Sequence, residues 1–370
     1  MSTSNKLFQA ASGGAGEAVY VEDVFSTFLY AGNDSTNQIQ NDIDLSGEGG
    51  MVWIKSRSSG SMNNVITDTE RGVNKNLTVN YDYAQNTDPS INSFNSNGFT
   101  LNTTYSDWND TGHDYVSWTF RKQAGFFDVV TYTGNGSNRT ISHNLGSVPG
   151  LMIVKRTSDT EGWQVYHRNL ATDEYIELNS TNAASNSNGT LRWNNTRPTA
   201  TELSLGTHDS VNANGSTYVA YLFAHDDQSF GDGSDEAIIK CGSYTGNATT
   251  RIIDVGFEPQ WILLKRTDST EDWYILDVMR GMAFPTAGQD YLRPNLSAAE
   301  SNSQDNYPHP MSNGFRLTFE ADTNGSGEDY IYVAIRRPMK TPTAGSDVFS
   351  VYGYTDATLT SGGITASNRT

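Results

Sequence analysis

Short apolar runs of about five to eight residues alternate with polar, turn-forming residues along almost the whole chain. The runs 218–223 and 330–335 are apolar or aromatic at nearly every position, which is typical of strands covered on both faces. Gly, Asn, Asp and Pro separate the runs, and few windows show a helical period. The best of these windows is a single turn at 298–300. The pattern predicts an all-β protein of antiparallel strands, arranged as sandwiches or jelly rolls.

Three motifs recur at similar spacing, which indicates internal repeats. The first ends in a turn after a tyrosine, at Tyr30, Tyr132, Tyr244 and Tyr354. The second places a lysine after an apolar run. The third is Asn-x-x-Gly followed by a tyrosine. The second motif occurs three times, at Lys55, Lys155 and Lys265. The third also occurs three times, before Tyr115, Tyr218 and Tyr330. We therefore predict an N-terminal arm, three β-sandwich repeats and the start of a fourth or a C-terminal extension, at 1–23, 24–124, 126–226, 237–338 and 346–370.

Composition and charge limit what the chain can bind. Aromatic residues make up 11% of the chain and charged residues 18%, so it should fold despite only 36% hydrophobic content. The formal net charge of -18 repels phosphate backbones and anionic lipid, so no nucleic acid is expected as a partner. Cys241 is the only cysteine, so no disulfide forms within one chain. The N-terminus has no signal-peptide pattern and no segment is long enough to insert into a membrane, which indicates synthesis in a cytoplasm.

The sequence lacks strong catalytic motifs, and we predict that the protein is not an enzyme. It contains no Gly-x-Ser-x-Gly, no phosphate-binding Gly-x-x-x-x-Gly-Lys and no His-Glu-x-x-His. Glu161 and Glu271 recur at equivalent positions, but each repeat then supplies a single carboxylate. Glycoside hydrolysis needs two carboxylates across one bond, which leaves a polysaccharide-cleaving enzyme as a minor alternative.

Two tryptophans are candidate ligand-binding residues. Trp163 and Trp273 stand two positions after Glu161 and Glu271, each behind a polar hairpin. An exposed indole beside an acid can stack on a sugar ring, whereas a tryptophan that begins a strand can equally pack in the core. The first repeat has Asn63 at this position.

Acidic loops before the last strand of two repeats suggest Ca²⁺ as an optional ligand, although no cofactor is required. In the third repeat the candidate metal ligands are Asp322, Asn324 and Asp329. Ca²⁺ prefers such oxygen ligands, but the spacing departs from the EF-hand pattern. Asn-x-x-Gly is also a common turn, so both interpretations stay open.

With these motifs the chain resembles virion proteins of marine tailed phages, especially cyanophages. They are described as structural or tail-fibre-like proteins with concanavalin A-like (laminin G-like) repeats. The resemblance rests on Tyr-Thr-Gly-Asn, on the apolar run before Lys155-Arg156, on Trp-Gln-Val-Tyr-His and on the run before Ala224, and it also covers the segment around Tyr20. These motifs lie at 132–135 and 244–247, 148–156, 163–167, 218–224 and 18–27.

The resemblance implies an appendage of a virus particle whose repeats project outward and bind host-surface glycans. We also expect a homotrimer, and an N-terminal arm that docks on other virion proteins. A capsid- or tail-decorating protein without glycan binding is the alternative.

Overall fold

The computed structural model describes residues 18–342 apart from 103–105, 284–288, 304–306 and 319–320. These residues are 7% helical and 41% strand, and every pairing between their named strands is antiparallel, so the predicted all-β fold class is confirmed. The described residues as far as Met339 belong to one compact unit. The second unit is 340–370, of which the structure describes only the first three residues.

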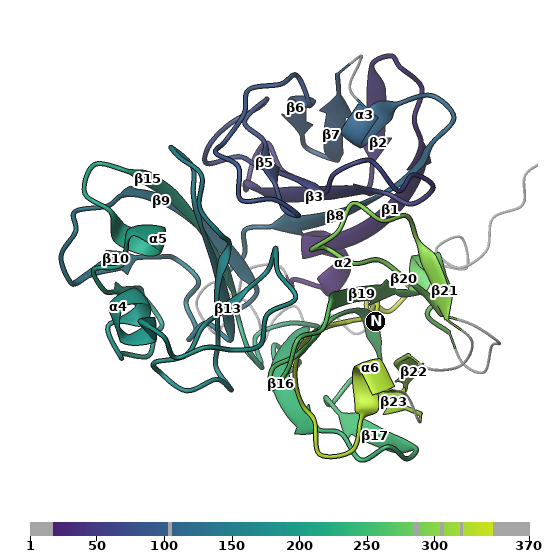
Figure 1. Cartoon of the computed structure of the whole chain (residues 1–370). Helices are drawn as coiled ribbons and strands as arrows, with labels where there is room; N and C mark the ends of the chain where they lie inside the picture. Colours follow the sequence, from purple (N-terminus) through teal and green to yellow (C-terminus); the bar gives the residue numbers. More distant parts are fainter. Residues whose placement is uncertain (1–17, 103–105, 284–288, 304–306, 319–320, 343–370) are drawn as a thin grey trace, which may run out of the picture. The chain divides into compact units, whose positions relative to one another are not determined.

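The first part of the chain forms two facing sheets, which we call the first module (Figure 1). The larger sheet has the strand order β1-β8-β3-β4-β5, and the smaller has the order β2-β7-β6. The helices are single turns. The bounds are α2 Val21–Val24, β1 Phe25–Ala31, β2 Asn37–Gln40, β3 Gly50–Ser56, β4 Val65–Asp68, β5 Leu77–Thr78, β6 Ile91–Asn95, β7 Gly98–Leu101, α3 Ser106–Asn109 and β8 Asp114–Arg121.

The second module repeats the large sheet in the order β13-β12-β11-β15-β9 and pairs β10 with β14 in the small one. In the larger sheet, the last strand of the module, β15, lies between β9 and β11, as β8 lies between β1 and β3 in the first module. The bounds are β9 Phe127–Thr133, β10 Arg139–Ser142, β11 Leu151–Arg156, β12 Gln164–His167, β13 Ile176–Glu177, α4 Gly189–Trp193, β14 Glu202–Leu205, α5 Asp209–Asn212 and β15 Thr217–Phe223.

The third module has the order β16-β24-β18-β19 in its larger sheet, with β17-β23-β22 facing it and β20 paired with β21. The bounds are β16 Ile239–Thr245, β17 Arg251–Asp254, β18 Pro259–Arg266, β19 Trp273–Asp277, η1 Val278–Arg280, β20 Gln289–Tyr291, β21 Ser301–Ser303, β22 His309–Met311, β23 Gly314–Leu317, α6 Ala321–Asn324 and β24 Asp329–Arg336.

The three repeat lysines occupy one position in the three larger sheets. Lys55 pairs with Val116, and Lys155 and Lys265 pair with the corresponding residues of β15 and β24. The tyrosine of the third motif is the second residue of the last strand in each module. The registers therefore define equivalent residues in all three modules. Whether each module folds as a domain by itself stays a prediction.

The central strands are buried on both faces, as their continuous apolar runs predict, but the two faces meet different partners. On β3, Val52 and Ile54 belong to the core between the two sheets of the first module. The alternate residues, Met51 and Trp53, belong to a second core that contains residues of all three modules. Successive side chains of a strand point to opposite faces, so one strand contributes to both cores.

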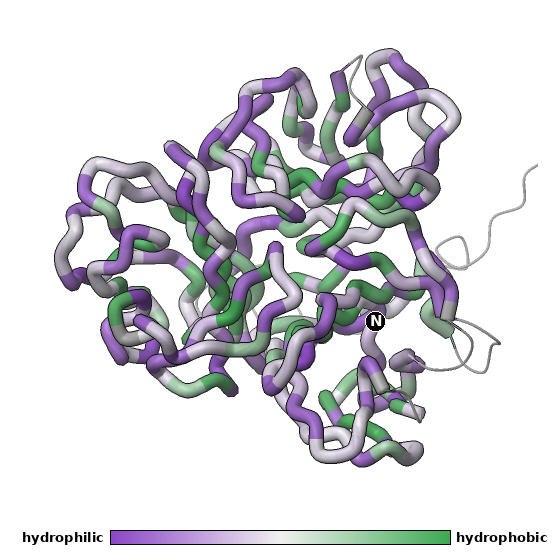
Figure 2. Tube along the Cα trace, in the orientation of Figure 1, coloured by the Kyte–Doolittle hydropathy of each residue, from purple (hydrophilic) through white to green (hydrophobic). Residues whose placement is uncertain are grey.

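The shared core joins the larger sheets of the modules. Phe120 of the first module lies in T-shaped contact with Phe223 of the second and with Trp261 of the third. The hydrophobic residues follow the strands in Figure 2, while the connecting loops are mostly hydrophilic. Burial of this apolar surface between modules stabilises the unit as a whole.

The predicted arm and the segment between the second and third repeats also take part in this packing. Of the arm 1–23, the structure describes residues 18–23, where Val21 is buried in the shared core; the rest lies outside the described residues. In the segment 227–236, which joins the second and third repeats, Phe230 is buried and the Gly231 N–H donates to the carbonyl oxygen of Val19. The predicted fourth repeat, 346–370, also lies outside the described residues. No helix within the described ranges is long and apolar enough to cross a membrane.

Candidate functional site

Each module extends one loop onto the next, and these three segments are called the docking loops: 79–85, 178–184 and 294–300. The last residue of each loop donates a backbone hydrogen bond to the residue two positions after the repeat lysine of the next module. These bonds run from Gln85 to Thr157, from Ala184 to Thr267 and from Glu300 to Arg57, at 2.8–2.9 Å. The first module thus contacts the second, the second the third, and the third the first, which closes a cycle of equivalent contacts within one chain.

The repeat lysines are buried at these junctions. Lys155 Nζ donates to the carbonyl oxygen of Asp82, and Lys265 Nζ donates to that of Thr181, both at 3.2 Å. Lys55 Nζ donates to Leu296 at 2.8 Å. Burial lowers the lysine pKa to about 7 at Lys55 and to about 8 at the other two.

The two tryptophans proposed as sugar platforms lie in the core. Trp163 and Trp273 are 0% and 1% exposed. Trp163 Nε1 donates to the carbonyl oxygens of Thr78 and Tyr81 on the first module, and Trp273 Nε1 donates to that of Glu177 on the second. A buried indole offers no face to a sugar ring, so the expectation of an exposed platform at these residues is corrected: they hold the neighbouring module.

In the first module an asparagine amide, in place of an indole, donates hydrogen bonds to the neighbouring module. Asn64 Nδ2 donates to the carbonyl oxygens of Pro294 and Leu296, at 3.2 and 2.9 Å. Asn64, and not Asn63 as the sequence spacing indicated, stands at the tryptophan position, because Val65 pairs with Ile54 as Gln164 pairs with Val154. The donor role at the junction is therefore kept although the residue type changes.

Glu161 and Glu271 lie at the same junctions and act through their backbones. The N–H of Glu161 donates to the carbonyl oxygen of Asp82, and that of Glu271 to Thr181, both at 2.8 Å. Their half-buried carboxylates bond locally, since Glu271 Oε1 accepts from the backbone of Asp272 and from the hydroxyl of Tyr274. The Thr-Glu-x-Trp motif thus forms part of the surface that binds the neighbouring module's docking loop.

A second set of polar contacts crosses the junctions at the end of β4, β12 and β19. The Tyr221 hydroxyl donates to Asp68 Oδ2 at 2.7 Å, and Trp118 Nε1 donates to Asp277 Oδ2 at 3.0 Å. At the equivalent third position His167 Nε2 donates to a backbone carbonyl oxygen of β24 at 3.2 Å. Burial lowers the pKa of His167 to about 3, so its imidazole is neutral at physiological pH.

The predicted metal ligands are placed around the turn before β24. Asn324 is buried, and its amide accepts from the backbone of Asn247 and donates to Thr249 and Thr318. Asp329 is exposed and accepts from the Thr245 hydroxyl, while Asp322 is half-buried. Within the part of the chain that the structure describes, no group of three or more His, Cys, Asp or Glu side chains is placed to hold a metal ion. The bonds of Asn324 support the turn interpretation, and Ca²⁺ binding stays a prediction.

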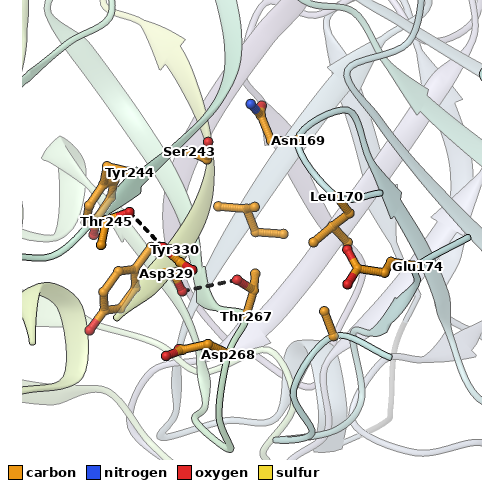
Figure 3. Close-up of a pocket in the computed structure, with 12 residues that line it drawn as sticks. Asn169, Leu170, Glu174, Ser243, Tyr244, Thr245, Thr267, Asp268, Asp329 and Tyr330 are labelled. Carbon is orange, nitrogen blue, oxygen red and sulfur yellow. Dashed lines mark hydrogen bonds between the residues drawn. The ribbon is translucent and has the colours of Figure 1, made fainter. Parts of the chain in front are cut away.

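A polar groove of about 650 Å³ lies between the second and third modules (Figure 3). One wall carries Asn169, Leu170 and Glu174, and the other carries residues of β16, β24 and the turn after β18. Asp329 connects two parts of the second wall by hydrogen bonds. Its carboxylate accepts from the Thr245 hydroxyl, and its carbonyl oxygen accepts from the Thr267 hydroxyl. Hydroxyl, amide and carboxylate groups on both walls can exchange hydrogen bonds with a polar ligand. The lining residues are Asn169, Leu170, Glu174, Ala184, Ser243, Tyr244, Thr245, Thr267, Asp268, Asp329, Tyr330 and Ile331.

Sequence reasoning noticed the repeat lysines but missed their role and missed the docking loops. A lysine inside an apolar strand run was the available signal, because a buried ammonium needs nearby carbonyl oxygens. An asparagine at the second position of each docking loop was another. Asn80, Asn179 and Asn295 each accept from the backbone at the Asn64 or tryptophan position of their own module, at 2.9–3.0 Å.

Three interlocked antiparallel β modules define the structural class of this protein. Residues 21–338 match a family described as a domain of unknown function (DUF7483), and the chain belongs to this family. No curated protein matches the chain. Among solved structures, the crystal structure of the viral capsid protein STIV MCP is similar at 10% identity and a TM-score of 0.17. The similarity covers 57% of this chain and 96% of that chain. A TM-score of this size does not indicate a shared fold.

Proposed function

We propose that this chain is a non-enzymatic building block of a virus particle, carried on an appendage such as a tail fibre. The observation that carries the proposal is the closed cycle of docking loops. Each module is held by both neighbours through buried hydrogen bonds and a shared core. A chain locked in this way is a rigid unit that presents fixed loops, which suits a structural role. The sequence resemblance to marine phage virion proteins supports the same role.

The test of the structural role is to locate the chain on particles. Antibodies against the recombinant protein should label purified particles, and mass spectrometry should find the chain in them at constant stoichiometry. A host cytoplasmic protein carried through the same purification is the control. Abundance in infected-cell lysate without any signal in purified particles would contradict the proposal.

We also propose that the surface binds uncharged host-surface glycans, with the polar groove as one place of contact. Ser243 and Thr245 are exposed on the groove wall, and carboxylates stand on both sides. Ser243→Arg should fill the groove without disturbing the buried core and weaken binding on a glycan array. The matched control is Ser137→Arg, which makes the same change at an exposed position that does not line the groove. Equal binding by both variants would exclude the groove.

Self-association and docking on other virion proteins belong to the same proposal. The junctions inside one chain are already filled by its own docking loops, so a homotrimer would use other surfaces. Light scattering of the purified protein should then give three times the monomer mass of 40.5 kDa. A mass of one chain would show that the proposed trimer does not form.

A further inference from the structure

Two neighbouring tyrosines on the first docking loop are unusually exposed. Tyr81 and Tyr83 are 42% and 53% exposed. Their rings are stacked, with centroids 4.8 Å apart and planes 11° from parallel. The two rings bury apolar surface only against each other, and their remaining faces stay in water. Exposed apolar surface of this kind often marks a binding site.

Three hydrogen bonds from the second module fix the backbone of this tyrosine pair. Trp163 Nε1 bonds the carbonyl oxygen of Tyr81 at 3.1 Å. Lys155 Nζ and the N–H of Glu161 both bond the carbonyl oxygen of Asp82. The two tyrosines therefore stand on a fixed support, and a ligand that binds them has little backbone entropy to remove.

The tyrosines are not needed for docking. The second docking loop has Ser180 and Asn182 at the equivalent positions. It still accepts hydrogen bonds from Lys265 and Glu271 and donates one to Thr267 of the third module. The third has Leu296 and Ala298. The aromatic pair is thus specific to the first loop, whereas the hydrogen bond from the last residue of the loop to the next module is common to all three.

We propose that Tyr81 and Tyr83 form a platform that binds an uncharged sugar ring of a glycan; this rests on the proposed glycan-binding role and gives it a second place of contact. A tyrosine ring offers an apolar face for the C–H groups of a sugar and a hydroxyl for its polar edge. The exposed carboxylate of Asp82, which stands between the two tyrosines in the sequence, can accept hydrogen bonds from sugar hydroxyls. The net charge of -18 disfavours acidic sugars, which commits the proposal to neutral ones.

The experiment uses the full-length protein on an array of neutral and acidic oligosaccharides, followed by titration of the best neutral oligosaccharide. Tyr81→Ser/Tyr83→Asn gives the first docking loop the side chains of the second loop at these two positions, and the second loop keeps the bonds to the repeat lysine and to the residue two positions after it. Asn182→Ala, at the equivalent exposed position of the second module, is the matched control. We expect the wild type and the control to bind alike, and the double variant to bind at least about tenfold more weakly.

The outcomes separate the platform from the broader role. Unchanged binding by the double variant overturns the platform and leaves glycan binding standing. Absence of any neutral-sugar binding by the wild type overturns both, and binding of acidic sugars alone overturns the assigned ligand class. If the double variant changes the mass measured by light scattering and no sugar binds, the pair is a protein contact and the proposal is wrong.

Discussion

At the scale of single residues, the asparagine of Asn-x-x-Gly does more than permit a turn. In the second module the Asn212 amide accepts from the backbone of Asn135 and donates to the carbonyl oxygens of Ser137 and Gly206. Asn109 and Asn324 make equivalent bonds in their modules. Each is buried, so its amide satisfies backbone groups that water does not reach.

Asn212→Ala should therefore destabilise the protein by roughly 2–4 kcal/mol, because three backbone groups lose a partner in or near the core. Asn214→Ala, at an exposed neighbouring position, is the control and should stay within about 0.5 kcal/mol of the wild type. Urea unfolding followed by tryptophan fluorescence measures both. Equal midpoints for the two variants would show that the amide bonds contribute nothing.

At the scale of elements, the first and last strands of each larger sheet are joined by a stacked tyrosine pair. Tyr132 on β9 and Tyr218 on β15 have centroids 5.1 Å apart with planes at 12°. The other two modules repeat the pair with nearly the same geometry. The Tyr132 hydroxyl bonds the carbonyl oxygen of Val211, so the pair also ties the strands to the turn that precedes β15.

Truncation of the buried Tyr218 to Ala should cost about 3–5 kcal/mol, as for other core aromatics. Tyr218→Phe keeps the stack but loses the hydroxyl bonds to Asp209 and Ala213, and should cost about 1–3 kcal/mol. Thermal unfolding should rank the variants in this order. The exposed Tyr83→Ala is the control with no large effect, and a Tyr218→Ala melting point equal to its own would contradict the assignment.

At the scale of the whole unit, the cycle of docking loops buries three lysines whose pKa values are lowered by desolvation. The unfolded chain keeps the ordinary lysine value of 10.5. Below about pH 7 the lysines are protonated in both states, and the cost of burying the charge is fully present. As pH rises above 7 the folded state releases these protons first, so the unfolded state binds more protons and stability rises.

The free energy of unfolding should therefore increase between pH 7 and pH 9, by on the order of 1–2 kcal/mol per lysine. This window lies above the lowered pKa of the histidines His143, His167, His208 and His225 and below the raised pKa of the buried tyrosines. Lys155→Met/Lys265→Met should flatten the increase, whereas the exposed Lys75→Met should leave it unchanged. Denaturant titrations at several pH values measure this, and an unaltered slope in the double variant would contradict it.

The strands, the repeats and the equivalent positions of the lysines and tyrosines follow from the sequence by itself. Each depends on local rules: the period of two along a strand, and turn residues between strands. The two-faced burial of the central strands was also readable, because their apolar runs are continuous.

Only the tertiary structure decided what covers the second face and what the Thr-Glu-x-Trp motif does. Trp163 and Lys155 bond carbonyl oxygens of residues more than 70 positions away, and Lys55 bonds one 241 positions away. Every residue has a carbonyl oxygen, so the partner of such a bond leaves no mark in the sequence. The recurrence of the motif therefore indicated a contact surface on each repeat. The partner of that surface, a loop of the neighbouring module, is determined by how the three modules pack.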